Sequence, residues 1–200
     1  MIWVAVTCAA AMGRRIGHPD PGTLDEWERI GRELRAEYLE RGWNETAQAY
    51  TMAYGSEVLD ASILRLVLFK AIDPHDPRLV KTLDAIQRDL GDGDLLYRYR
   101  IDDGLEGDEA TFTACAFWRV GVLALCGRTR QATDMFERLL GRGNDLGLFA
   151  EEIDAASGEQ RGNFPQAFTH VAIINHALRL QNSIDEFGMV EDRDLESRKD

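Results

Sequence analysis

Apolar residues recur at intervals of three and four along most of this 200-residue chain, which is the spacing of one helix face. Convincing strand alternation is not found, although a short hairpin around residues 50–54 is also allowed. The pattern therefore predicts an all-α fold. We expect about seven helices, at residues 1–17, 23–41, 57–71, 77–90, 109–126, 129–140 and 165–180.

The predicted helix starts carry side chains that can accept hydrogen bonds from the first backbone N–H groups. These are Thr23 with Glu26 as a capping box, Ser56, Asp76 before Pro77, and Asp108. The segment 1–17 has no such residue in front of it. Arg14 and Arg15 follow its apolar run, which is the reverse of the order in a signal peptide. We therefore interpret this segment as an amphipathic or buried helix, and we expect Met1 to lie within that helix and not at its start.

Fully apolar segments alternate with segments that are apolar on one face. Residues 57–69 precede the one-faced segment 77–86, and residues 109–126 precede the one-faced segment 130–140. A two-layer toroid needs this alternation, because its inner ring is covered on both sides and its outer ring on one. A stack of helical hairpins fits the same pattern, but none of the known repeat signatures is present.

The composition restricts the kinds of partner that we expect this chain to bind. Two hundred residues, 44% of them hydrophobic, suffice for one sizeable core. A net charge of −12 opposes binding to nucleic acid, and no apolar run reaches the length of a membrane span. We therefore expect one domain at residues 1–183, with an acidic and flexible tail at 184–200. Neither a nucleic acid nor a membrane is an expected partner.

The cysteines predict no disulfide and no metal site. Cys115 and Cys126 lie in one predicted helix, where eleven residues of rise, roughly 16 Å, prevent a bridge. We expect these two and Cys8 to be buried free thiols in a reducing compartment, the cytoplasm. No His and Cys cluster has zinc spacing, and the acidic residues 92–103 lack the order of a calcium loop. We expect no cofactor.

Three long loops, at residues 50–54, 98–109 and 148–168, combine carboxylates, an Arg beside a Tyr, and aromatic rings. That mixture suits a carbohydrate cleft, where rings pack on sugar faces and charged groups bind hydroxyls. Glycoside hydrolysis needs two carboxyl groups, one on each side of the scissile bond. Glu151 can supply one. Glu109 and Asp60 are candidates for the other, although Asp60 also suits a hydrogen bond to a helix end.

Several stretches carry a resemblance to a known family. They are IGHPDPGTLDEWERIGRELRAEYLERGWN, YGSEVLDASILRL, LLYRYR, DGLEGDEATFTACAFW and NDLGLFAEEIDAASGEQRGNFPQAFTHVAIINHAL. Together they resemble the C-terminal part of the bacterial glucoamylase and trehalase-like enzymes of glycoside hydrolase family 15. The similarity runs from Met1 to about Gln181, and its most specific part is AEEID followed by GNFPQAFTH.

The resemblance implies an (α/α)6 barrel, present here as an incomplete toroid, and inverting hydrolysis of an α-glucosidic bond. We expect the glucoamylase type, which releases glucose from non-reducing ends, with an α,α-trehalase as the alternative. By the same resemblance Glu151 matches the general base. Glu152 and His170 are expected to surround Glu151 without touching the substrate. The residues that it places against the α-glucoside are Arg98, Tyr99, Glu109, Phe112 and Phe168.

One departure from the family matters for activity. The resemblance places the general acid in a segment that would precede Met1, so we expect a truncated barrel without its proton donor. Loss of general acid catalysis costs about 10² to 10⁴ in rate, and these 200 residues by themselves should have little or no activity. The alternative from another class is an inactive helical fragment that binds a sugar or a protein. Exposed apolar helices such as residues 1–12 would also favour self-association.

Overall fold

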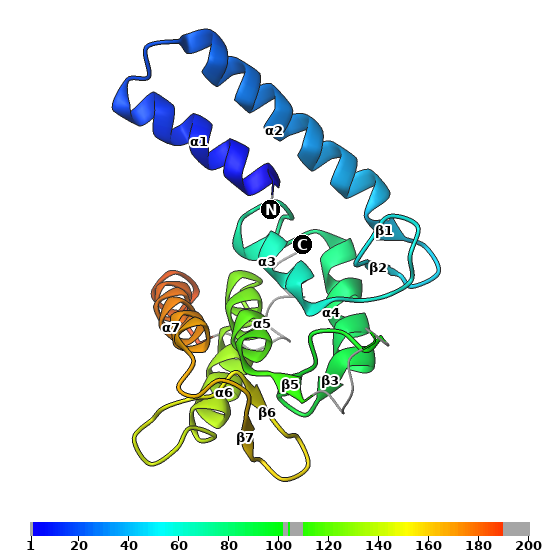
Figure 1. Ribbon diagram of the computed structural model, residues 1–200, viewed down its shortest axis with the longest axis vertical. Coiled ribbons are helices and arrows are strands. Elements are labelled where there is room, and N and C mark those ends of the chain that lie inside the picture. The colour runs from blue at the N-terminus through cyan, green and yellow to red at the C-terminus, as the bar shows by residue number, and fades with distance from the viewer. Residues whose placement is uncertain (1, 102–103, 105–109, 190–200) are drawn as a thin grey trace.

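The computed structural model describes residues 2–101, 104 and 110–189. Within them, seven α-helices and one short 3-10 helix are joined by loops that carry seven two-residue strands (Figure 1). The α-helices are α1 (Ile2–Ile16), α2 (Pro21–Arg41), α3 (Leu64–Leu68), α4 (Pro77–Leu90), α5 (Thr113–Leu125), α6 (Thr129–Leu140) and α7 (Ala167–Phe187). The 3-10 helix η1 (Ala61–Ile63) leads directly into α3. The predicted all-α fold is confirmed.

Helix α5 is the centre of the packing. It is buried along nearly its whole length, lies between α3 and α7, and contacts α6 as well. At its middle, Phe117 packs edge-on against Phe136 of α6 and Phe149, with ring centroids 5.8 Å apart in both pairs. Because Phe149 stands two residues before Glu151, this core contact fixes the start of the loop that carries the candidate base.

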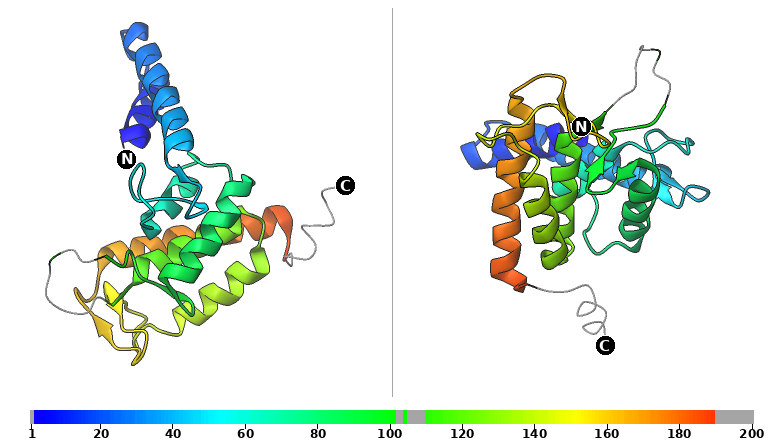
Figure 2. Two further views of the ribbon diagram at one scale, coloured as in Figure 1. Left: turned by 90° about the vertical axis from the view of Figure 1, so that its right-hand side faces the viewer. Right: turned by 90° about the horizontal axis from the view of Figure 1, so that it is seen from below.

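The predicted alternation of inner and outer helices is confirmed for the pair α5 and α6, whereas the predicted inner segment 57–69 contains only the short helix α3, and Phe69 after it is exposed. Helix α6 buries one face against α5 and α7 and exposes the other, and α4 is amphipathic in the same way. Helices α1 and α2 pack against each other as a hairpin, which projects away from the remaining helices (Figures 1 and 2). This arrangement of paired helices is a sector of an (α/α) barrel, the incomplete toroid that we predicted.

The strands form three small sheets in the loops. β1 (Trp43–Asn44) pairs with β2 (Ala49–Tyr50), and β3 (Gly91–Asp92) pairs with β4 (Leu95–Leu96). The third sheet has the order β5 (Thr111–Phe112), β6 (Glu152–Ile153) and β7 (Gln160–Arg161), and all pairs are antiparallel. Strands of two residues give no detectable alternation, which is why the sequence did not reveal them.

Two predicted caps are wrong. Asp20, and not the Thr23 and Glu26 box, caps α2: its Oδ1 accepts a hydrogen bond from Gly22 N at 3.0 Å. Ser56 accepts one from Val58 N in a turn, and the helical segment begins only after Asp60. Asp108, the last predicted start, lies outside the described residues, and α5 begins at Thr113.

Asp76 does cap α4 as predicted, and its Oδ1 accepts a hydrogen bond from Arg78 N at 2.8 Å. Helix α7 continues to Phe187, past the boundary at residue 183 that the sequence suggested. Cys115 is buried and Cys126 half-buried, but Cys8 is exposed, because it lies on the solvent side of the projecting hairpin. Of the described helices, none is both long enough and apolar enough to cross a membrane.

Candidate active site

The site is built around the first residues of the helices α3, α5 and α7. Two equivalent backbone hydrogen bonds hold its candidate residues. Ala61 N, at the start of η1, donates to the carbonyl oxygen of Arg98 at 2.7 Å. Thr113 N, at the start of α5, donates to the carbonyl oxygen of Glu151 at 2.9 Å. Each helix start therefore fixes a site residue that comes from the loop after the following helix, α4 for Arg98 and α6 for Glu151.

Glu151 is half-buried and lies in a bend immediately before β6. Its Oε2 accepts hydrogen bonds from Asn163 Nδ2 at 2.8 Å and from Asn163 N at 3.3 Å. Its backbone N–H donates to the carbonyl oxygen of Asn163 at 2.9 Å. These three bonds cross the β6–β7 hairpin, so the carboxylate is held in one orientation by a neutral donor.

Gly162 lets the chain pass close to this carboxylate. Its φ is +73°, in the left-handed region that favours glycine. A Cβ atom added there would lie 3.1 Å from both Cβ and Oε2 of Glu151. The position of Glu151 therefore depends on the absence of a side chain at residue 162.

Arg98 lies apart from that hairpin, beside η1. Its Nε is 3.6 Å from Oδ1 of Asp60, and its guanidinium carbon is 5.8 Å from the centre of the Tyr99 ring. Arg98 and Asp60 line a cavity of about 290 Å³ that also contains Ser62, Arg65 and Phe69. The cavity offers both charged groups and an aromatic face, as a sugar subsite requires.

The predicted aromatic residues meet one another. Phe112, at the end of β5, and Phe168, in the first turn of α7, have ring centroids 6.3 Å apart. Trp118 of α5 contacts both rings, and the guanidinium carbon of Arg65 lies 5.3 Å from its ring centre. Phe168 and Trp118 line a second cavity of about 370 Å³, which shares Arg65 and Phe69 with the first. The arginine and the aromatic cluster therefore border neighbouring hollows.

Cys115 lies in the first turn of α5 and is fully buried, and the charges of Asp60 and Arg98 act on its thiol. Burial raises the pKa of the Cys115 thiol, the negative charge of Asp60 raises it further, and the positive charge of Arg98 lowers it. Cys115 is two residues after Thr113, which binds the backbone of Glu151. The first turn of α5 thus connects the part of the site with Arg98 to the part with Glu151.

The remaining predicted residues have supporting positions. Glu152 pairs with Phe112 in the three-stranded sheet. His170 Nδ1 lies 2.7 Å from the carbonyl oxygen of Gln166, and Phe149 N donates to His170 Nε2 at 3.4 Å. This pattern assigns the ring proton to Nδ1. Glu109 lies outside the described residues.

Sequence reasoning missed three residues that the structure brings into the site: Asn163, Trp118 and Arg65. Asn163 stands inside GNFP, next to the recognised AEEID block, and an amide twelve residues from an acid gives no signal of contact. In the sequence, Trp118 has the pattern of an ordinary core residue. Arg65 has the pattern of an ordinary surface residue of an apolar helix. Only the packing of α3 on α5 shows that they stack.

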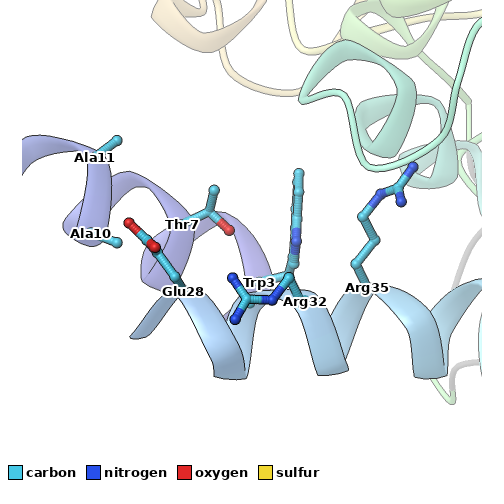
Figure 3. A pocket seen from close by; sticks show the side chains of 8 residues that line it. Trp3, Thr7, Ala10, Ala11, Glu28, Arg32 and Arg35 are labelled. Atoms are coloured by element: carbon cyan, nitrogen blue, oxygen red, sulfur yellow. The ribbon is translucent and has the colours of Figure 1, made fainter. Parts of the chain in front are cut away.

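A separate hollow of about 340 Å³ lies between α1 and α2, and Figure 3 shows its lining side chains. It combines the Trp3 ring with Glu28, Arg32 and Arg35 and contains none of the predicted site residues. Arg35 also donates to the carbonyl oxygen of Ala71 at 2.7 Å, which ties the helical hairpin to the rest of the chain. Within the described ranges, no group of His, Cys, Asp and Glu residues is arranged to hold a metal ion.

Comparison with solved structures defines the class of fold. A bacterial glucoamylase complexed with acarbose superposes with a TM-score of 0.71 at 16% identity, over 92% of this chain and 34% of that one. A structure described as a wild-type glycosidase gives 0.68 at 17% identity, over 82% of this chain and 46% of that one. The fold is thus that of α-helical barrel glycosidases.

Residues 1–178 match the family described as glycosyl hydrolases family 15, and the chain belongs to that family. It is 42% identical over 195 residues to a trehalase of Mycobacterium tuberculosis, covering 94% of this chain and 28% of that protein. It is 38% identical over 185 residues to a trehalase of Thermoplasma volcanium, covering 92% of this chain and 29% of that protein. The chain therefore spans less than a third of the length of these curated relatives.

Proposed function

We propose that these residues form part of an inverting glycoside hydrolase that cleaves α,α-trehalose, with Glu151 as its general base. The observation that supports trehalose as the substrate is the 42% identity to the Mycobacterium tuberculosis trehalase. The glucoamylase structure is only 16% identical and therefore supports the fold alone. The comparisons thus favour the trehalase alternative over the glucoamylase reading that we placed first.

The surroundings of Glu151 suit a base. Asn163 engages Oε2, so Oε1 is the oxygen that would accept the proton of the attacking water. Asn163 is neutral, and a neutral donor orients the carboxylate without pairing its charge. We assign no general acid among these residues. The resemblance to the family places that group in a different segment.

Substrate binding is assigned to the two neighbouring cavities. Arg98, with Tyr99 beside it, would donate hydrogen bonds to the hydroxyls of one glucosyl unit. Phe112 and Phe168 would present ring faces to the sugar, and the buried Trp118 would support both rings. Glu109 is proposed as a further contact from its loop. Glu152 and His170 would hold the loop of the base through strand pairing and the contact with Phe149 N.

The test measures glucose release from trehalose, maltose and starch. It uses the 200-residue chain and any longer polypeptide that contains these residues. In the active form, Glu151→Gln should lower kcat for trehalose about 10²- to 10⁴-fold, because the amide cannot accept the proton of water. Glu159→Gln is the matched control, because Glu159 is exposed and belongs to the same β6–β7 hairpin.

The stereochemistry provides an independent readout. Inverting hydrolysis of α,α-trehalose gives one β-glucose and one α-glucose, and NMR at early times can detect both anomers. Faster release of glucose from maltose than from trehalose would favour the glucoamylase reading. Trehalose binding without turnover would support the alternative of a helical sugar-binding module, and turnover unaffected by Glu151→Gln would contradict the role of the base.

Self-association is a second proposal. Helix α1 exposes Ile2 and Ile16 to 71% and 70%, and α7 exposes Ile174 and Leu178 to 60% and 62%. Such apolar surfaces favour association between protein chains. Sedimentation of the chain with Ile174→Glu should show a smaller assembly than the parent. The reducing, cytoplasmic setting stays a prediction from the free cysteines.

A further inference from the structure

Asp60 is an acidic residue in an unusual position. It is only 5% exposed, and its Oδ1 accepts a hydrogen bond from Ser62 N at 2.6 Å, which caps η1. The same oxygen lies 3.6 Å from Nε of Arg98, whose side chain is 47% exposed. One buried carboxylate oxygen therefore faces two donors, one from its own helix and one from a loop 38 residues later.

Capping does not explain the burial. Asp20 and Asp76 cap α2 and α4 through the same contact, from Oδ1 to the backbone N–H two residues later. Asp20 is exposed and Asp76 is half-buried. Removing a carboxylate from water is costly unless an opposite charge or hydrogen bonds replace the lost hydration. Arg98 is the cation that offsets this cost at Asp60.

Arg98 is attached to this segment at two levels. Its carbonyl oxygen accepts a hydrogen bond from Ala61 N at 2.7 Å, and its Nε–H faces the carboxylate of the preceding residue, Asp60. The fixed backbone and the ion pair at Nε together restrict an otherwise flexible side chain. The two terminal amino groups carry the other four N–H donors of the guanidinium. Since Arg98 lines the cavity beside η1, its orientation decides what those donors can reach.

We propose that Asp60 is a positioning residue that orients the Arg98 guanidinium for hydrogen bonding to the hydroxyls of a glucosyl unit. The inference rests on the proposed function, because it takes Arg98 as a sugar-binding residue. Asp60 is thereby removed from the candidates for the second catalytic carboxylate, because it is only 5% exposed and forms an ion pair with Arg98. It acts on the substrate through Arg98.

The test compares Asp60→Asn with Asp76→Asn in the active protein. In both variants the amide oxygen can still accept the capping hydrogen bond, so both helix starts keep their cap and lose one negative charge. Asp60→Asn should lower kcat/KM for trehalose about 10- to 100-fold, as expected for a misplaced binding group. Asp76→Asn should leave kcat/KM within twofold of the parent.

A double-mutant cycle separates positioning from a structural role. In the Arg98→Ala background, Asp60→Asn should have little further effect on kcat/KM, because the group it orients has been removed. An equal loss with and without Arg98 would overturn the proposal, and so would an Asp60→Asn variant with unchanged kcat/KM. Thermal unfolding of all variants checks that the folded state is retained.

A measurement without turnover distinguishes failure of this inference from failure of the proposed function. NMR of the Arg98 Nε–H should show a chemical shift that changes in Asp60→Asn, because the neighbouring negative charge is lost, and stays unchanged in Asp76→Asn. If that pattern appears but Arg98→Ala does not change trehalose turnover, the sugar-binding role is overturned while the pair remains. If Arg98→Ala abolishes turnover and the signal does not respond to Asp60→Asn, only the positioning role is overturned.

Discussion

Glu151 Oε2 accepts a hydrogen bond of 2.8 Å from Nδ2 of Asn163, across the β6–β7 hairpin. This contact joins the candidate base, immediately before β6, to a residue that lies two positions after β7. A carboxylate on a loop gains a defined orientation only from such partners, because the loop backbone by itself allows many rotamers.

Asn163→Ala removes the side-chain donor and should lower kcat about 10- to 100-fold, because Glu151 loses its orientation. Stability should fall by only about 1 kcal/mol, the typical contribution of one hydrogen bond. Asn44→Ala is the control, since the Asn44 side chain accepts hydrogen bonds from Thr46 N and Ala47 N in the β1–β2 hairpin. An equal loss of activity in both variants would point to general destabilisation.

Gly162→Ala tests the close approach to Glu151. Gly162 and Gly158 stand in the same hairpin with φ of +73° and +75°. A side chain should cost each variant about 1–2 kcal/mol of stability through left-handed backbone strain. A Cβ at residue 162 also contacts Glu151, whereas one at residue 158 meets nothing within 4 Å. Activity measured under folded conditions should therefore fall in Gly162→Ala and be kept in Gly158→Ala.

The packing of α5 on α7 depends on Gly121. A Cβ there would clash with the imidazole ring of His176, and a rigid ring in a tight interface cannot move aside without cost. Gly121→Ala should lower the free energy of unfolding by about 1–3 kcal/mol. The double variant with His176→Ala should recover part of that loss in a denaturant titration. Destabilisation that persists in full without the His176 ring would show that the clash is not its cause.

His176 should make stability fall in mild acid. Burial, with a smaller contribution from the charge of Arg179, lowers the pKa of His176 from 6.5 to about 4. The unfolded state therefore binds the proton more readily, so the contribution is fully present above pH 6.5 and is lost as the pH falls towards 4. The maximum loss is about 3 kcal/mol.

Denaturant titrations at pH 7.5 and pH 4.5 measure this effect. The loss of stability between these two pH values should be smaller in His176→Gln than in the parent. His75→Gln is the control, because His75 is exposed on the loop before α4. An identical loss in the parent and in His176→Gln would assign the acid sensitivity to other groups.

The helices that were predicted well have amphipathic faces and local caps. The bounds of α4 and α6 match the predicted residues 77–90 and 129–140, because apolar spacing and the following glycine are local signals. Predictions failed where a tertiary contact replaced a local one. Asp60 ends an extended segment whose backbone is tied to Arg98, so the helix predicted from residue 57 begins at Ala61.

The sequence by itself determined the all-α class and the alternation of inner and outer helices, because the hydrophobic period is a local property of the chain. It also determined the family, because AEEID and GNFPQAFTH are continuous blocks of residues. The tertiary structure decided which side chains meet. Asp60 on Arg98 and Arg65 on Trp118 are contacts between distant segments, and Asn163 meets Glu151 across the β6–β7 hairpin. The first two distances depend on how the helices pack and the third on the register of the hairpin, and no local pattern of residue types encodes either.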